Sequence, residues 1–183
     1  MTRFISALLL IFLLSFNANA GDNPAPPAKQ SSVNFYHFEI LGSTVFAAKT
    51  EMSLKLLEGS TTFSTLSPYI AAIKESEHSG MLAWTEKPVF QAGKATWNSG
   101  TAWYAGAIAH DGCHSLLYHR AKKNWLGKVP AEAWTGKKAE QHCLAVQAEV
   151  LIEIKADRYF VDYVNGLIAD PTYQDIPYSN RNW

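Results

Sequence analysis

Apolar side chains recur at helical spacing in three long stretches of the chain. The stretches cover about residues 44–58, 102–122 and 137–156, and apolar residues that return every three or four positions are typical of helices that bury one face. Ser43 stands where a side-chain cap is expected, and Gly59 stands where a helix would end. We therefore predict one helix over 44–58 and two longer helices over the other stretches.

Two shorter helices are also predicted. Residues 67–76 begin with Ser67-Pro68, which suits a cap and a first turn, and the buried face of this helix would be Tyr69, Ile70 and Ile73. Residues 157–167 predict a last short helix.

In the helix predicted over 44–58, the apolar positions that fall at helical spacing are Val45, Ala48, Met52, Leu56 and Leu57.

Strands are predicted in the middle of the chain. Residues 81–85 and 88–91 are short and apolar around Glu86-Lys87, which predicts a small β-hairpin, with a third strand over 95–97. Residues 33–40 fit a strand and an extended segment equally well. Together the elements predict an α+β fold that is mainly helical. An extended substrate could be held as an added strand along the exposed edge of the hairpin.

The start of the chain predicts export. Arg3, the apolar run over 7–16 and the small residues of 18–20 have the pattern of a signal peptide that is removed after residue 20. The alternative is an uncleaved anchor, but the apolar run is short for a membrane span. Residues 21–32 are rich in Pro, Ala, Ser and Lys and predict a flexible leader. Residues 33–183 would then form a single exported domain, periplasmic or secreted, with no membrane anchor after cleavage.

Charge and cysteine content limit the expected binding partners and predict a disulfide. The chain carries 16 basic and 16 acidic side chains without a basic stripe, so nucleic acid and anionic membrane surfaces are not expected partners. The two cysteines, Cys113 and Cys143, are expected to be paired because disulfides persist outside the cytoplasm. The alternatives are two free thiols, or thiols that bind a metal.

The candidate chemistry lies in the helix predicted over 102–122. His110 and His114 are four residues apart, and this spacing places two imidazoles on one helical face, one turn apart. Two such imidazoles can bind one Zn²⁺ from one side. With Asp111 between them, the motif is H-D-x-x-H.

A zinc site needs a third protein ligand, and the candidate is Glu140. Cys143 lies three residues after Glu140, and Cys113 lies between the two histidines. A bridge between the cysteines would hold their Cα atoms within about 7 Å, and would thereby place Glu140 beside the histidine pair. His142 is the competing third ligand, but it points about 100° away from Cys143 on a helix.

Two more residues are candidates for supporting roles. Gln147 lies one turn beyond Cys143 and could bond a histidine's distal nitrogen or the activated water. Tyr118 lies one turn beyond His114, where it fits either an oxyanion donor or a core residue.

The stretch Trp103-Tyr104-Ala105-Gly106 through His110-Asp111-x-x-His114-Ser115, followed by Glu140-x-x-Cys143-x-x-x-Gln147, resembles the zincin-type pattern of small secreted metallopeptidases. The resemblance covers about residues 81–155. It implies a gluzincin-like core of two backing helices, a small sheet, the H-x-x-x-H helix and a glutamate helix. It also implies a zinc-dependent peptidase, with a peptide or protein substrate, whose ligands are His110, His114 and Glu140 and whose general base is Asp111.

The motif departs from this family at Asp111. The base must reach the water that attacks the substrate, and aspartate is one methylene shorter than the glutamate found in such enzymes. Zinc binding therefore tolerates this departure better than proteolysis does.

Two other classes of protein remain open. In a non-catalytic protein, the metal would stabilise the fold, and a partner would bind an aromatic surface made of Trp84, Trp97, Trp125, Trp134 and Trp183. In an HD-type metal phosphohydrolase, His110-Asp111 would be joined by His78 and by Asp157 or Asp162, although export and a disulfide fit that class poorly. The aromatic chain end, with Tyr173, Tyr178, Arg181 and Trp183, is expected to pack on the domain; the alternative is that it shapes the cleft.

Overall fold

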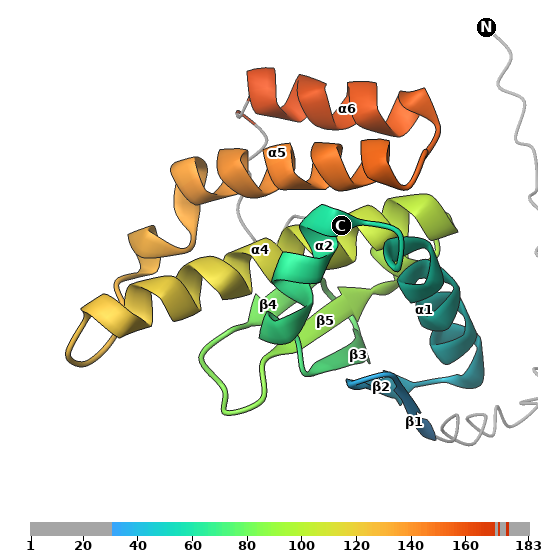
Figure 1. The fold of residues 1–183 in the computed structure, drawn as a ribbon, viewed down its shortest axis with the longest axis horizontal. Helices are drawn as coiled ribbons and strands as arrows, with labels where there is room; N and C mark the ends of the chain where they lie inside the picture. Colours follow the sequence, from blue (N-terminus) through green and yellow to red (C-terminus); the bar gives the residue numbers. More distant parts are fainter. Residues whose placement is uncertain (1–30, 171, 173–174, 176–183) are drawn as a thin grey trace, which may run out of the picture.

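The computed structural model describes residues 31–170, 172 and 175. The fold is α+β and mainly helical, as predicted, with a five-stranded mixed sheet covered by helices (Figure 1). The predicted signal peptide, most of the predicted leader and the aromatic residues Tyr173, Tyr178 and Trp183 lie outside the described residues. Among the described helices, none combines the length and the apolar character needed to cross a bilayer.

The sheet is built from the first half of the described chain. Its strands are β1 (Ser31–Phe35), β2 (Phe38–Gly42), β3 (Ala72–Ser76), β4 (Gly80–Leu82) and β5 (Val89–Gly93), in the spatial order β1-β2-β3-β5-β4. The three inner strands are parallel to one another, whereas β1 and β4 pair antiparallel at the two edges. Residues 33–40 therefore belong to a hairpin, and the hairpin predicted over 81–91 is confirmed, with a shorter first strand and a second strand that continues to Gly93.

Two predicted elements are wrong, and both lie in short segments. The predicted helix over 67–76 is replaced by a 3₁₀ turn, η1 (Ser67–Tyr69), and by strand β3, while a short helix, α2 (Thr61–Leu66), precedes them. Ile73 is fully buried as expected, but on a strand that has a neighbour on each side. A short apolar run buried in this way does not distinguish a helix from a strand. The predicted strand over 95–97 is the helix α3 (Lys94–Trp97).

Helix α1 (Thr44–Leu57) begins at its predicted cap but buries a different face. The Ser43 Oγ accepts the Phe46 N–H at 3.3 Å, and the buried apolar residues are Phe46, Ala47, Leu54 and Leu57. By contrast, four of the five apolar positions selected by spacing are exposed: Val45 at 58%, Met52 at 54%, Leu56 at 40%, and Ala48.

The reason is that the inward face of α1 carries buried hydroxyl groups. Thr50 Oγ1 lies 3.0 Å from the Tyr104 hydroxyl, and Ser53 Oγ donates to the Thr101 carbonyl at 3.0 Å. Both Thr50 and Ser53 are fully buried. Because two polar residues lie on the inward side, the apolar positions alone point to the wrong side of the helix.

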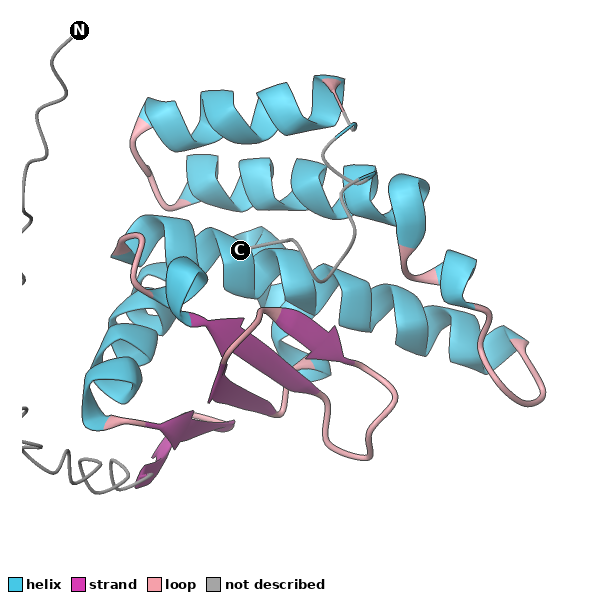
Figure 2. Ribbon diagram, turned by 180° about the vertical axis from the view of Figure 1, so that it is seen from behind, coloured by secondary structure: helices cyan, strands magenta, loops and turns pink. Residues whose placement is uncertain are grey.

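Three helices form successive layers beside the sheet. They are α4 (Thr101–Asn124), α5 (Gly136–Glu153) and α6 (Arg158–Ala169), close to the helices predicted over 102–122, 137–156 and 157–167. Both ribbon views place α4 between the sheet and α5, and α5 between α4 and α6 (Figures 1 and 2). The face of α4 turned away from the sheet is therefore the face that meets α5.

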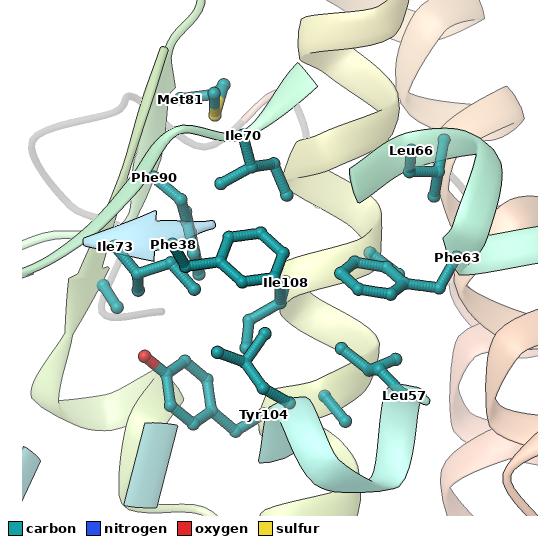
Figure 3. Packing of buried hydrophobic residues seen from close by; sticks show 14 of the residues in the cluster. Phe38, Leu57, Phe63, Leu66, Ile70, Ile73, Met81, Phe90, Tyr104 and Ile108 are labelled. Carbon is teal, nitrogen blue, oxygen red and sulfur yellow. The ribbon is translucent and has the colours of Figure 1, made fainter. Parts of the chain in front are cut away.

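The core between the sheet and α4 fixes the position of α4. Ile73 and Phe90 from the sheet, Phe63 from α2, and Tyr104 and Ile108 from α4 pack together in it (Figure 3). Gly112 accounts for the close approach of α4 to this core, because a Cβ there would lie 2.9 Å from the Ile70 Cδ1. The glycine inside α4 thus accommodates another element.

Glu153 ties the end of α5 to the start of α2. Its carboxylate accepts hydrogen bonds from the Ser60 hydroxyl and from the Thr62 N–H and hydroxyl, the latter at 3.0 Å. Thr62 lies in the first turn of α2, whose backbone N–H groups have no partner within the helix. Glu153 therefore satisfies these donors from a distant part of the chain and fixes α5 over α2.

Candidate metal centre

Three side chains from α4 and α5 converge, as predicted from the sequence. His110 and His114 lie one turn apart on α4, and their Nε2 atoms are 3.1 Å from each other. Glu140 faces them from α5: its Oε1 is 3.4 Å from His110 Nε2, and its Oε2 is 3.2 Å from His114 Nε2. Within the described part of the chain, these residues form the one His/Cys/Asp/Glu group able to hold a metal ion.

A disulfide joins the two helices beside this group. Cys113 and Cys143 are bonded, with their Cα atoms 5.5 Å apart, and both are fully buried. Cys113 precedes His114 directly, and Cys143 follows Glu140 by three residues. The predicted pairing is confirmed, and the bridge holds the helix of Glu140 against the helix of the histidines.

Backbone contacts prepare His114 for a metal. Its Nδ1 lies 2.7 Å from the carbonyl oxygen of Trp134, to which it donates as N–H. In a neutral imidazole this leaves the Nε2 lone pair directed at Glu140 and His110, and zinc-binding histidines typically make such a hydrogen bond through the nitrogen that does not bind the metal. His110 lacks such a contact, since its buried Nδ1 has no partner among the described residues.

The spacing of the three side chains fits a small tetrahedral ion. With zinc–ligand distances of about 2.0–2.1 Å, two ligand atoms of a tetrahedral site lie about 3.3 Å apart. The three measured separations are 3.1, 3.2 and 3.4 Å. Two imidazole nitrogens and a carboxylate oxygen form a donor set that suits Zn²⁺ and leaves a fourth position open.

The electrostatics of the centre lower the pKa of the glutamate and raise the pKa of one histidine. Burial alone would raise the pKa of Glu140, but hydrogen bonds from His110 and His114 lower it well below its ordinary value. Burial alone would lower the pKa of His114, but the hydrogen bond to Glu140 and the charge of Asp111 raise it above its ordinary value. The negative charges of Glu140 and Asp111 therefore attract cations in the metal-free protein as well.

Asp111 lies next to the three candidate ligands. It is half-buried and lines the same cavity as they do. Burial raises the pKa of Asp111 to about 6; the nearby histidines His110 and His114 oppose this rise, and Glu140 adds to it. At neutral pH this carboxylate is mainly ionised, with a pKa in the range that suits a general base.

The cavity has a volume of about 600 Å³ and opens over the ligand group. One wall is formed by α4 and α5, and the opposite wall is formed by Ser79, the edge strand β4, Trp84, Gln91 and Thr96. From α5 the cavity is lined by Lys137, Glu140, Leu144 and Gln147, which follow one another every three or four residues and so share one face of the helix. Along α5, the candidate ligand Glu140 thus lies between Lys137 and Gln147 in the lining of the cavity.

The two predicted supporting residues lie in different places. Gln147 lines the cavity and is 4% exposed, and its Cγ would lie 3.3 Å from a Cβ at Gly106, one turn before His110. Tyr118 does not line the cavity; its ring packs edge-on against Trp134, with ring centroids 5.4 Å apart. Gln147 is therefore placed to contact a ligand, whereas Tyr118 supports the loop that contacts His114.

The residues that an HD-type site would need are not brought together. Asp157 caps α6, where its Oδ1 accepts the Tyr159 N–H at 2.8 Å, and Asp162 pairs with Arg158 on the same helix. His78 lies in the turn between β3 and β4 and does not line the cavity. His142, the competing third ligand, is exposed and does not line the cavity either.

Three features of the site were not predicted from the sequence. Trp134 supplies the carbonyl for His114, while Trp84 and Lys137 line the cavity. Lys137 could have been noted, because it lies three residues before Glu140 and hence on the same face of its helix. The other two depend on how loops fold back over α4, for which the sequence carries no periodic signal.

Comparisons of the chain with protein-family models, with curated proteins and with solved structures find no match.

Proposed function

We propose that the protein is an exported zinc-dependent hydrolase that cleaves peptide bonds. The observation that carries the proposal is the convergence of His110, His114 and Glu140, with ligand atoms 3.1–3.4 Å apart, in the lining of a cleft. The buried disulfide beside the group fits a protein that matures in an oxidising compartment. The zincin-type pattern in the sequence supports the same class of enzyme.

The roles of the side chains follow from their positions. When bound, zinc would supply Lewis acidity that polarises a carbonyl group and makes water nucleophilic near neutral pH. Asp111 would accept the proton of the attacking water, because it borders the ligand group and is mainly ionised above its pKa of about 6. The cleft would hold the substrate in place while this proton moves.

The edge strand offers a way to bind an extended peptide. β4 pairs with β5 on one side and lines the cavity with Gly80, Met81 and Leu82. A peptide that adds to the free side of β4 would run along the cleft and pass the candidate ligands. Such backbone pairing would position a scissile bond with little dependence on its side chains.

Metal content and hydrolysis test this proposal together. The mature protein is expected to contain one equivalent of zinc, and His114→Ala and Glu140→Ala should each lower it to less than a tenth. His142→Ala, on the exposed side of α5, is the matched control and should keep the metal.

Zinc-loaded wild type should cleave a peptide library, and Asp111→Asn should bind zinc but lose at least 10²-fold in kcat. A wild-type protein that proves to contain no zinc and to bind none would refute the proposal.

A non-catalytic metal-stabilised protein is the second candidate. It is favoured by the fact that the ligand group bridges α4 and α5, so that a bound ion would add a second cross-link beside the disulfide. Under this hypothesis zinc raises the melting temperature, no peptide is cleaved, and Asp111→Glu, which lengthens the side chain, brings no activity.

A further inference from the structure

The cleft has one cationic end. Lys137 is the one lysine or arginine among the described residues that line it, and it lies three residues before Glu140 on the same face of α5. Side chains at this spacing have Cβ atoms about 5–6 Å apart. A negatively charged group of the substrate that binds Lys137 would therefore lie within one or two residues of the bond at the metal centre.

The start of α5 strengthens the attraction of this end for an anion. Thr135 makes no side-chain cap, and no acidic residue stands in the first turn of α5, which is 18 residues long. Thr135 and Gly136 both line the cleft next to Lys137. The uncapped N–H groups and the positive end of the helix dipole thus add to the charge of the lysine.

Lys137 already binds a carboxylate of the protein. Asp175 Oδ1 lies 2.9 Å from Lys137 Nζ, and both side chains are more than half exposed, at 63% and 57%. An exposed ion pair of this kind stabilises the protein by only about 0–1 kcal/mol. A substrate carboxylate can therefore displace Asp175 at little cost, and the pair shows that Lys137 can bind a carboxylate.

The same end carries an open aromatic wall. Trp84 lines the cleft and is 54% exposed, and its ring lies edge-on to Trp134, with centroids 5.7 Å apart. Trp134 directly precedes Thr135 at the start of α5. Exposed indole surface in a cleft suits a bulky apolar side chain, which buries it without leaving a polar group unpaired.

We propose that the enzyme is a carboxypeptidase for chains that end in an aromatic or large apolar residue. Lys137 binds the terminal carboxylate, and Trp84 with Trp134 receives the last side chain. Water adds to the carbonyl carbon of the penultimate residue, the C–N bond breaks, and the released amine takes up a proton. The products are a shortened peptide with a new carboxylate and one free amino acid. This inference rests on the proposed peptidase function and specifies its substrate.

The test compares N-acetyl-Ala-Phe as the free acid with the same dipeptide as its C-terminal amide. Zinc-loaded wild type should hydrolyse the acid with a kcat/KM at least tenfold higher than that for the amide. Lys137→Met should remove this preference, mainly through a higher KM for the acid, and Lys137→Arg should keep it. Lys138→Met is the matched control, because Lys138 is the next residue, is exposed and does not line the cleft.

A binding measurement does not depend on turnover. Titration calorimetry on metal-free protein should give tighter binding of the acid than of the amide, and Lys137→Met should abolish the difference. Replacing the terminal Phe by Ala should weaken binding to wild type but have little effect with Trp84→Ala.

The outcomes separate the two proposals. Equal rates for acid and amide, or cleavage of long peptides at internal bonds alone, would overturn the carboxypeptidase inference and leave the peptidase proposal standing. If a zinc-loaded protein cleaves neither dipeptide nor any library peptide, the peptidase proposal fails and the carboxypeptidase inference fails with it. The acid-over-amide binding preference would then decide only whether Lys137 binds carboxylates.

Discussion

Cys113 and Cys143 are bonded between α4 and α5, and each lies within three residues of candidate metal ligands. The bridge thus fixes the distance between the two halves of the centre: His110 and His114 on one helix and Glu140 on the other. Because both sulfurs are fully buried, packing also depends on them. Stability and metal affinity should therefore change together when the bridge is removed.

The double variant Cys113→Ala/Cys143→Ala tests this coupling. The bridged cysteines are 30 residues apart, and for a loop of this size loss of the bridge is expected to lower the free energy of unfolding by about 3–4 kcal/mol. Zinc affinity should fall about 10-fold or more, because Glu140 is no longer held opposite the histidines. Urea unfolding and competition with a zinc chelator measure the two effects. A folded variant with unchanged zinc affinity would contradict the coupling.

Asp111→Asn should stabilise the metal-free protein near neutral pH. The pKa of Asp111 in the folded protein is about 6, above its ordinary value of 3.8, so wild type loses stability as the pH rises from about 4 through 6. The full shift corresponds to about 3 kcal/mol, and screening at the cavity surface reduces the expected gain to about 1–2 kcal/mol.

Unfolding of EDTA-treated protein at pH 4 and pH 8 measures the effect of Asp111→Asn. The variant should gain stability at pH 8 and match wild type below about pH 4. Asp162→Asn, on the exposed side of α6, is the control and should show no such trend. A loss of stability at pH 8 in the variant would show that ionised Asp111 stabilises the metal-free protein, and would contradict the prediction.

Glu153→Gln should weaken the link between α5 and α2. Burial alone would raise the pKa of Glu153, but hydrogen bonds from Ser60 and Thr62 lower it below its ordinary value. Its contribution is therefore present at neutral pH and is lost as the pH falls below about 4.5. The variant should lose about 1–2 kcal/mol at pH 7 and much less under acid conditions. Glu149→Gln, exposed on the same helix, should have little effect at either pH.

Two glycine substitutions should have opposite effects. A Cβ at Gly106 would lie 3.1 Å from Leu151 Cδ2 and 3.3 Å from Gln147 Cγ, so Gly106→Ala should push α5 away from α4. Stability should fall by about 1–3 kcal/mol, and zinc affinity should fall with it. A Cβ at Gly166 in α6 would meet nothing within 4 Å, so Gly166→Ala should add about 0.5–1 kcal/mol. Thermal unfolding of the two variants compares them directly.

The sequence predicts the long helices and the features that depend on residues close to one another in the chain. Periodicity over many residues predicts α4 and α5, the Ser43 cap marks the start of α1 within its own turn, and the spacing of the cysteines and candidate ligands along two helices predicts their meeting. These features depend on residues within a few turns of one another, or on a covalent link between two helices.

Features set by distant packing were missed. Ile73 is buried in a strand because β2 and β5 flank it, and nothing in residues 67–76 records these neighbours. The inward face of α1 carries Thr50, whose hydroxyl meets Tyr104 from a helix far along the chain. Trp84 reaches the cleft only because β4 lies at the sheet edge beside α4. Each of these placements depends on contacts between segments that the sequence alone does not connect.

The order of the two site helices along the chain has a consequence for folding. His114 and Glu140 belong to consecutive long helices, whereas Glu153 must find Ser60 across more than ninety residues. Contacts between nearby segments form faster because less chain entropy is lost when they close. We expect the α4–α5 pair to dock first and to offer a cation-binding nucleus before the parallel strands have assembled.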